Sequence, residues 1–191
     1  MEGCYIPDLT SDIVSYLYIA DAYNLSSINQ RFHNLIYNIL DLDIHYKMTV
    51  PDIYNFCKLV SFSLDHQRHI NNISMLTNLT KLDISYNGTI SDISNLTNLT
   101  YLRLKWNDSV TNVSNLTNLT KLNMPLNHTI KNISTLTNLR YLNIKYNKQI
   151  TNDQLSSLTN LTYLDIRHNK SVTITSHLIN LKTLKQDRKM N

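Results

Sequence analysis

The sequence predicts an α/β solenoid, a stack of short repeats in which each repeat adds one strand to a parallel β-sheet. The first observation is that the tetrapeptide Leu-Thr-Asn-Leu begins at residues 76, 96, 116, 136 and 158, so successive copies lie 20, 20, 20 and 22 residues apart. The second is that every copy is followed by alternating polar and apolar residues and then by an Asn. Self-similarity at a nearly fixed period is the sequence signature of a repeat array.

Each repeat is expected to contain one short strand. In the first regular copy, Leu82 and Ile84 alternate with Lys81, Asp83 and Ser85, which is the pattern of a strand with one buried face. The apolar residues that follow the strand recur at three-residue spacing. That spacing is too tight for a full helix and favours a 3₁₀ turn or an extended segment.

The stretch 79–87 reads L-x-x-L-x-I-x-x-N and resembles a leucine-rich repeat. The resemblance implies a horseshoe with the parallel β-sheet on its concave face and short turns or 3₁₀ segments on its convex face. One repeat alone buries too little apolar surface to fold, so stacking of neighbouring repeats is expected to supply the stability.

The same register extends in both directions and predicts an array over residues 41–191 whose first two and last repeats are degenerate. Steps of 20 residues back from Leu82 reach Phe62 and then Leu42, and the last partial unit contains Leu184. We therefore expect the strands to continue at both ends of the regular array.

Two irregularities stand out within the array. The repeat after residue 147 is two residues longer than the others, and its segment 151–158 is expected to form a single helical turn capped by Asn152 or Asp153. Pro125 lies beside a predicted strand and lacks a backbone N–H, so a local break in strand pairing is expected there.

An Asn follows every regular strand at the point where the chain must turn. Its side-chain amide can donate and accept hydrogen bonds, and so can satisfy backbone groups that the turn leaves unpaired. We interpret these residues as a structural turn row rather than as a binding site. The row contains Asn87, Asn107, Asn127, Asn147 and Asn169.

Residues 1–40 do not fit the repeat, because their apolar residues recur at three- and four-residue spacings and predict a small helical unit. The order of Ile6-Pro-Asp-Leu9 and the apolar residues after it resembles an F-box, although Phe32 stands where that family has Trp and Ile6 where it has Leu. The resemblance implies docking to the Skp-type adaptor of a cullin-RING ubiquitin ligase through Pro7, Leu9, Ile13, Val14 and Leu17. The alternative is a helical cap that covers the open core of the first repeat.

The polar side chains of the strands are expected to form one broad partner-binding surface on the concave face. Aromatic and Arg side chains are enriched at interface anchors, and the only Trp of the chain lies in this set beside two basic residues. The candidate binding residues are Tyr101, Arg103, Lys105, Trp106, Tyr141, Lys145, Tyr146, Tyr163, Asp165 and Arg167.

Composition narrows the function further. The chain has 191 residues, two Cys and a formal net charge of +4. No signal peptide or 18-residue apolar run is visible, so we expect a cytoplasmic protein with no membrane span.

The spacing of its His and Cys residues matches no metal site or nucleophile motif, and its two Gly residues form no nucleotide-binding loop. We expect neither enzyme activity nor a cofactor.

The leading hypothesis from these features is a protein-protein interaction module that recruits substrates to a cullin-RING ubiquitin ligase. The alternative is a stand-alone leucine-rich repeat scaffold with a helical N-terminal cap. A weaker alternative is nucleic-acid binding through the basic and aromatic concave face. We expect a monomer that binds protein partners, and nucleic acid is the less favoured ligand.

Overall fold

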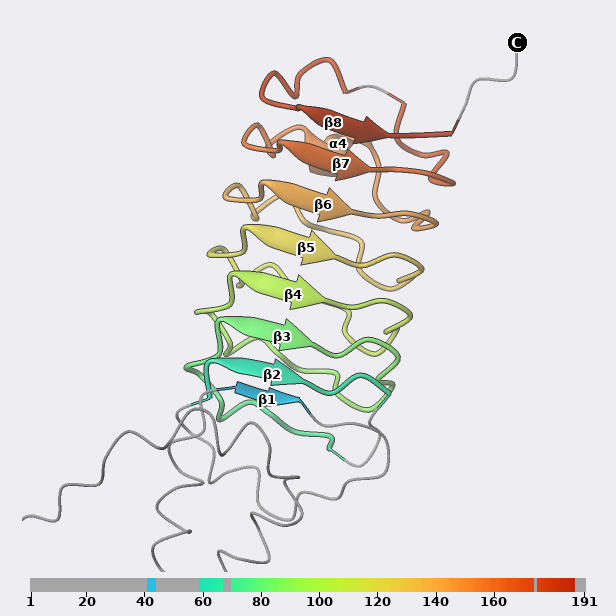
Figure 1. Ribbon diagram of the computed structural model, residues 1–191. Helices are drawn as coiled ribbons and strands as arrows, with labels where there is room; N and C mark the ends of the chain where they lie inside the picture. The colour runs from blue at the N-terminus through green and yellow to red at the C-terminus, as the bar shows by residue number, and fades with distance from the viewer. Residues whose placement is uncertain (1–40, 44–58, 67–69, 174, 188–191) are drawn as a thin grey trace, which may run out of the picture.

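The computed structural model describes residues 41–43, 59–66, 70–173 and 175–187. Within them the chain forms eight three-residue strands and one short helix, α4 at Asn152–Leu155 (Figure 1). The strands are β1 at Asp41–Asp43, β2 at Ser61–Ser63, β3 at Lys81–Asp83, β4 at Tyr101–Arg103, β5 at Lys121–Asn123, β6 at Tyr141–Asn143, β7 at Tyr163–Asp165 and β8 at Thr183–Lys185. The predicted parallel solenoid with little helix is confirmed.

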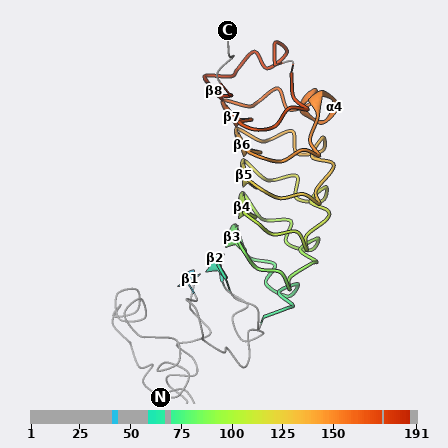
Figure 2. The same ribbon diagram turned by 90° about the vertical axis from the view of Figure 1, so that its right-hand side faces the viewer.

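All eight strands lie in one sheet in sequence order, and each pair is parallel. Residues 20 apart are partners from β1 to β6, as Leu82 and Leu102 illustrate, whereas Leu142 pairs with Leu164, 22 residues on. The two extra residues are accommodated in the connection that contains α4, so the register of the sheet is preserved. Seen from the side, the strands line the inner edge of a gently curved stack (Figure 2).

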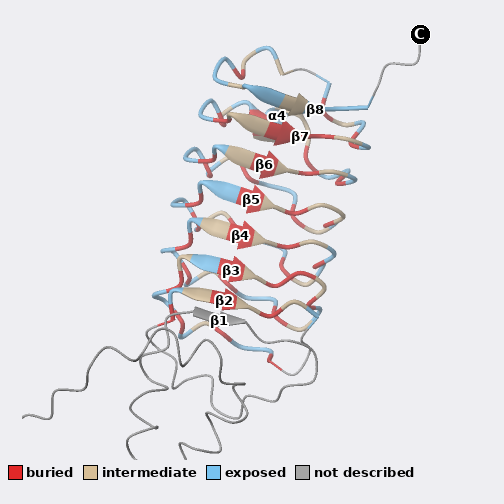
Figure 3. Ribbon diagram, in the orientation of Figure 1, coloured by how far each residue is buried: buried red, intermediate tan, exposed pale blue. Residues whose placement is uncertain are grey.

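The core is a continuous apolar column inside the stack, visible as the buried segments of each turn in Figure 3. Each repeat from β2 to β7 contributes the middle residue of its strand and residues of the returning segment. Burial of each such side chain stabilises the fold by about 1.5–3 kcal/mol relative to exposure. In the repeat from 81 to 100 the six buried apolar residues are Leu82, Ile84, Ile90, Ile93, Leu96 and Leu99.

The returning, convex side consists of consecutive tight turns. The Leu76 N–H donates to the Ile73 carbonyl at 3.0 Å, and the Leu79 N–H donates to the Leu76 carbonyl at 3.1 Å. Each turn places one apolar residue inward every three positions, which explains the spacing in the sequence. Of the two forms expected, the extended segment with isolated turns is found in the regular repeats, rather than a 3₁₀-helix.

The longer repeat contains the predicted helical turn, but its cap differs from the prediction. Thr151 is the N-cap residue, and Asn152 and Asp153 are the first residues of the helix itself. The Gln154 side chain folds back and accepts hydrogen bonds from the Thr151 N–H at 2.9 Å and from its hydroxyl at 2.7 Å. Both bonds are accepted by a Gln three residues after the N-cap Thr, and this contact fixes the start of the helix.

The predicted break at Pro125 is wrong, because strand pairing continues on both sides of it. At the matching position of the next repeat, the Lys145 N–H donates to the Asn143 side chain at 3.0 Å and not to a neighbouring strand. A proline here therefore removes no bond of the sheet, and its carbonyl still accepts from the Trp106 N–H at 3.3 Å. The Asn123 Oδ1 accepts instead from Asn143 Nδ2 at 3.0 Å.

The Asn turn row is buried and links each repeat to the one before it. Asn107 Oδ1 accepts from the N–H groups of Ser109 and Val110 at 3.1 and 3.0 Å. Its Nδ2 donates to the carbonyls of Ile84 at 3.0 Å and Asn87 at 2.6 Å. Each amide thus closes its own turn and also bridges to the preceding repeat.

The same bridge recurs along the array. Nδ2 of Asn127 donates to the Asn107 carbonyl, and that of Asn147 donates to the Asn127 carbonyl at 2.7 Å. In the longer repeat, Asn169 donates instead to the Ile150 carbonyl at 3.2 Å. These buried amides form a ladder that runs parallel to the apolar core.

A second ladder, not predicted from the sequence, lies on the surface at the other end of each strand. It uses the Asn of Leu-Thr-Asn-Leu, whose Nδ2 donates at 2.9 Å to the carbonyl of the Thr beside the equivalent Asn one repeat earlier. Its members are Asn98, Asn118, Asn138 and Asn160, and Asn180 of the related sequence Leu-Ile-Asn-Leu makes the same bond. The Asn residues of the tetrapeptide therefore connect repeats as well.

The expected N-terminal helical unit lies outside the described residues. The division at residue 40 and the F-box-like docking residues therefore stay predictions from the sequence. The array itself, with its degenerate first and last strands, is described from β1 to β8.

Asn107→Ala is expected to lower the free energy of unfolding by about 3 kcal/mol or more, because the Ser109 and Val110 N–H groups and the Asn87 carbonyl lose the partner that this side chain supplies, at roughly 1–3 kcal/mol each. Asn118→Ala is the matched control, since it removes one exposed hydrogen bond of the surface ladder and should cost less than about 1 kcal/mol. Urea unfolding monitored by circular dichroism measures both. Equal losses for the two variants would contradict the structural role of the buried turn row.

Candidate partner-binding surface

The register of the sheet arranges the outward side chains of the strands in columns. The first strand position forms a column, here named the Tyr–Lys column, whose members lie side by side because their strands are paired residue for residue. Neighbouring strands are about 4.8 Å apart, so adjacent side chains of a column are in contact range. The column contains Lys81, Tyr101, Lys121, Tyr141, Tyr163 and Thr183.

Lys121 lies between two aromatic rings of this column. Its Nζ is 5.1 Å from the ring centre of Tyr101 and 4.8 Å from that of Tyr141. Tyr141 in turn stacks on Tyr163, with ring centres 4.3 Å apart and an angle of 7° between the planes. The ammonium is thereby held by two cation–π contacts, which restrict a side chain that is otherwise flexible.

The phenols of Tyr101 and Tyr141 in this column stay protonated well above neutral pH. Burial is the main cause that raises the pKa of Tyr141 to about 12, and the neighbouring Tyr163 adds to the effect. Burial also raises the pKa of Tyr101, with a further contribution from the Asp83 carboxylate and an opposing one from Arg103. At neutral pH these residues offer hydroxyl groups that can donate hydrogen bonds.

The third strand position forms a second column, in which both acidic residues of β3–β7 are paired. Asp83 Oδ2 lies 3.2 Å from Arg103 Nη1. Asp165, whose side chain is 2% exposed, accepts from Arg167 Nη2 at 2.6 Å and from Arg167 Nε at 3.0 Å. Neither carboxylate is therefore left as an open negative site on this surface.

The Asp165–Arg167 pair is strong because it is bidentate and partly buried. Burial alone would raise the pKa of Asp165, but hydrogen bonds from the Arg167 side chain and backbone outweigh it and lower that pKa below its usual value. The same bonds raise the pKa of Arg167. Both groups are thus ionised at neutral pH.

A third row of side chains lies at the turn directly after the strands, and we name it the rim row. Its backbone is left-handed, with φ between 54° and 62°. Bulky side chains rarely adopt this conformation, which suits Gly and Asn. The row contains His66, Tyr86, Trp106, Leu126, Tyr146 and His168.

Backbone bonds hold the rim row in this conformation. The Tyr86 N–H donates to the Lys105 carbonyl at 2.8 Å, and the Tyr146 N–H donates to the Arg167 carbonyl at 2.9 Å. The left-handed residue therefore extends the pairing between repeats beyond the strand. Rings of neighbouring repeats stack in this row, with centres 4.2 Å apart for both His66–Tyr86 and Tyr146–His168.

The surface over β3–β7 is basic. It carries two carboxylates, Asp83 and Asp165, and six cationic side chains. No carboxylate in the described part of the chain lies within ion-pairing distance of the four Lys residues among them. The cations are Lys81, Arg103, Lys105, Lys121, Lys145 and Arg167.

The structure places nine of the ten predicted binding residues on this one surface, whereas the Asp165 side chain is buried and paired with Arg167. Tyr101, Tyr141 and Tyr163 share the Tyr–Lys column, and Trp106 and Tyr146 belong to the rim row. The Trp106 residue is 48% exposed to solvent. Their role in binding stays a prediction.

Sequence reasoning left Lys121 out of the predicted binding residues. Aligning the repeats by their 20-residue step would have placed it between Tyr101 and Tyr141. What alignment alone does not give is the stacking of rings, which depends on side-chain rotamers.

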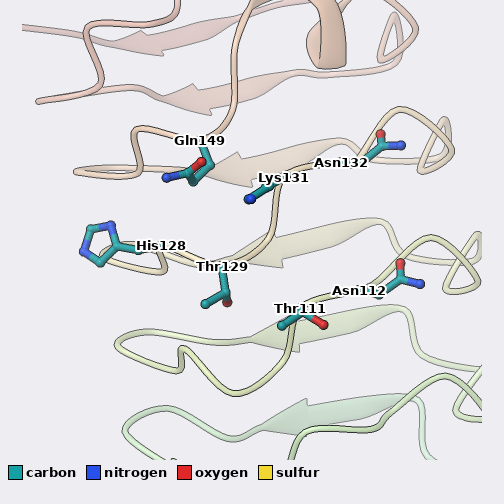
Figure 4. A pocket seen from close by; sticks show the side chains of 7 residues that line it. All are labelled: Thr111, Asn112, His128, Thr129, Lys131, Asn132 and Gln149. Carbon is teal, nitrogen blue, oxygen red and sulfur yellow. The ribbon is translucent and has the colours of Figure 1, made fainter.

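A shallow depression lies away from the strands, on the loops after β4, β5 and β6. Figure 4 shows its side chains spread along these three loops rather than directed at one centre. Among the described residues no group of three or more His, Cys, Asp or Glu could hold a metal ion. The lining residues are Thr111, Asn112, His128, Thr129, Lys131, Asn132 and Gln149.

Comparison with known proteins identifies the repeats. Residues 76–93, 135–158 and 157–173 match the family model of the Leucine Rich repeat. The comparison with curated proteins found no match. The chain contains leucine-rich repeats, and its solenoid is a leucine-rich repeat fold.

Solved structures with a similar fold include proteins from two bacteria, Listeria monocytogenes and Leptospira interrogans. The chain is similar to an internalin (inlF) from Listeria monocytogenes, with 26% identity and a TM-score of 0.69 over 86% of this chain and 54% of the other. It is also similar to a leucine-rich repeat protein from Leptospira interrogans, with 25% identity and a TM-score of 0.67 over 82% of this chain and 45% of the other. The chain therefore spans about half the length of each.

No helix in the described part of the chain is long and apolar enough to cross a membrane.

The ionised Asp165–Arg167 pair predicts a pH-dependent contribution to stability. Because the folded-state pKa of Asp165 is lowered, the pair stabilises the fold fully above the unfolded pKa of about 3.9 and loses this effect as the pH falls through the folded-state pKa. Asp165→Asn should lower the free energy of unfolding at neutral pH by about 1–2 kcal/mol. Urea unfolding of both proteins between neutral and strongly acidic pH should show this gap closing, and a constant gap would contradict the ionic origin.

Proposed function

We propose that this protein is a binding scaffold whose concave surface over β3–β7 holds a protein partner. The observation that carries the proposal is a contiguous surface of exposed and half-buried Tyr, Lys, Arg and Trp side chains on a parallel sheet. Aromatic and Arg side chains supply most of the binding energy at protein interfaces. Side chains fixed by stacking and ion pairs also lose little further freedom on binding.

The construction of the surface supports binding through shape and charge. Each repeat contributes two or three side chains at positions that the sheet fixes about 4.8 Å apart. Such a surface suits an extended partner that contacts several repeats at once. A partner held in this way would gain affinity from every strand it crosses.

A more specific role follows from the F-box-like segment 1–40. In this hypothesis the N-terminal unit docks a Skp-type adaptor of a cullin-RING ligase while the concave surface selects the substrate. It is supported by the sequence pattern around Pro7 and Leu9 alone. A cytoplasmic location and a monomeric state belong to the same proposal, and the second can be measured by light scattering.

Selection from a peptide library displayed on phage tests the scaffold proposal. For selected peptides, Tyr141→Ala or Trp106→Ala should raise the dissociation constant about tenfold or more, as truncation of an interface anchor does. Asn118→Ala on the surface ladder is the control and should leave it within about twofold. Peptides that bind every variant equally would place the binding site elsewhere.

The ligase role needs a separate experiment with the full chain. Purified protein and a purified Skp-type adaptor should co-elute in size-exclusion chromatography, whereas a variant with Leu9→Asp and Leu17→Asp should not, because a charge in an apolar interface lacks a partner. Failure of the folded wild type to co-elute would reject this role. The scaffold proposal would still stand on its own test.

A further inference from the structure

We propose that the partner of the concave surface is an acidic polypeptide segment, whose Asp and Glu carboxylates bind the lysines held against aromatic rings on β5 and in the turns after β4 and β6. This inference rests on the proposed function and specifies the chemistry of the ligand at that same surface. It is carried by three observations: the position of Lys121, the coverage of the tyrosine ring faces, and the pairing of the local carboxylates.

Lys121 is built as an anchor for an anion. Its ammonium is oriented by the rings of Tyr101 and Tyr141, 5.1 and 4.8 Å away, yet the residue is exposed to solvent. The rings interact with the charge but leave its N–H groups without a carboxylate. An ammonium held in place with open donors favours a carboxylate ligand, and the phenol groups beside it can donate further hydrogen bonds.

The same arrangement recurs across the surface. Lys105 Nζ lies 5.0 Å from the ring centre of Tyr86, and Lys145 Nζ lies 5.1 Å from that of Tyr146. The surface thus presents three ring-supported lysines, one on β5 and one in each of the turns after β4 and β6. Lys105 and Lys145 belong to repeats two strands apart, about 10 Å, and this separation is matched by side chains three residues apart in an extended peptide.

The coverage of the rings favours a polypeptide over a single-stranded nucleic acid. Base stacking requires an open aromatic face. Lys121 covers one face of the Tyr141 ring, and Tyr141 stacks on the ring of Tyr163. Lys185 Nζ lies 5.6 Å from the ring centre of Tyr163. The column therefore offers ring edges, hydroxyls and ammonium groups, which suit carboxylates better than bases.

The carboxylates on the surface cannot satisfy these lysines. Asp83 pairs with Arg103 and Asp165 pairs with Arg167, which leaves the lysine charges for an incoming ligand. Complementary charge of this kind fixes which partner binds and speeds its association. An acidic segment thus matches the surface better than a neutral or basic one.

The experiment measures binding of two dye-labelled peptides to the full chain by fluorescence anisotropy. One peptide is rich in Glu, and the other has the same length with Gln at every Glu position. Lys121→Gln removes the anchoring charge but keeps the length of the side chain. Lys131→Gln is the matched control, because this exposed lysine lies off the sheet in the loop after β5 and its substitution changes the net charge equally.

We expect the wild type to bind the Glu peptide and to bind the Gln peptide at least about tenfold more weakly, with affinity falling as salt rises. Lys121→Gln should weaken binding of the Glu peptide about fivefold to tenfold, and Lys131→Gln by less than about twofold. The fluorescence of Trp106, the only Trp in the chain, should change on binding, since the residue lies at the edge of this surface. Circular dichroism checks that both variants fold.

Several outcomes would overturn the inference. Equal losses for the two lysine variants would mean that net charge alone attracts the peptide. Absent binding of the Glu peptide, equal binding of the Gln peptide, or tighter binding of a single-stranded oligothymidylate would each reject an acidic polypeptide as the ligand. None of these results would affect peptides selected from the library, so failure here is distinguishable from failure of the scaffold proposal.

Discussion

The interaction on which the rest of the structure depends is the bridge made by each buried Asn amide to the preceding repeat. Asn107 accepts from two N–H groups of its own turn and donates to two carbonyls of the repeat before it. Without this bridge the turn after each strand would bury unpaired backbone groups, each costing about 1–3 kcal/mol. The ladder therefore fixes the rise between repeats, and through it the spacing of every column on the concave surface.

That fixed spacing explains how unfavourable local conformations are tolerated at the rim. Tyr86, Trp106 and Tyr146 adopt left-handed backbone angles that bulky side chains normally avoid. The Asn that follows each of them is anchored, and their own N–H groups donate to the next repeat at 2.8–3.3 Å. Strained positions persist where the surroundings over-determine them, and they cluster at functional surfaces. The rim row thus combines a structural constraint with exposed rings.

Most of the fold could be predicted because every repeat of a solenoid forms the same strand and the same turn. The period gave the register of all eight strands, and the Asn at the end of each strand indicated the turn row. The errors arose where a backbone group had an unanticipated partner. Pro125 occupies a position whose N–H does not join the sheet, and Thr151 rather than Asn152 caps the short helix because Gln154 folds back onto it. The surface ladder is not predictable in the same way, because its Asn residues are exposed and bond to a backbone carbonyl one repeat away.

The residues of the candidate surface could be predicted from the sequence, but the contacts between their side chains could not. Alternation along a strand shows that Tyr141 and Tyr163 point outward, yet only the offset of 22 residues at the longer repeat makes them neighbours. Because they stack, their ring faces are covered, and the surface suits anions better than nucleic-acid bases. The ladder and the core lie inside the stack, whereas the columns and the rim lie outside it. Substitutions on the surface can therefore alter the partner without altering the repeat that carries it, which is how one rigid fold can present many different binding surfaces.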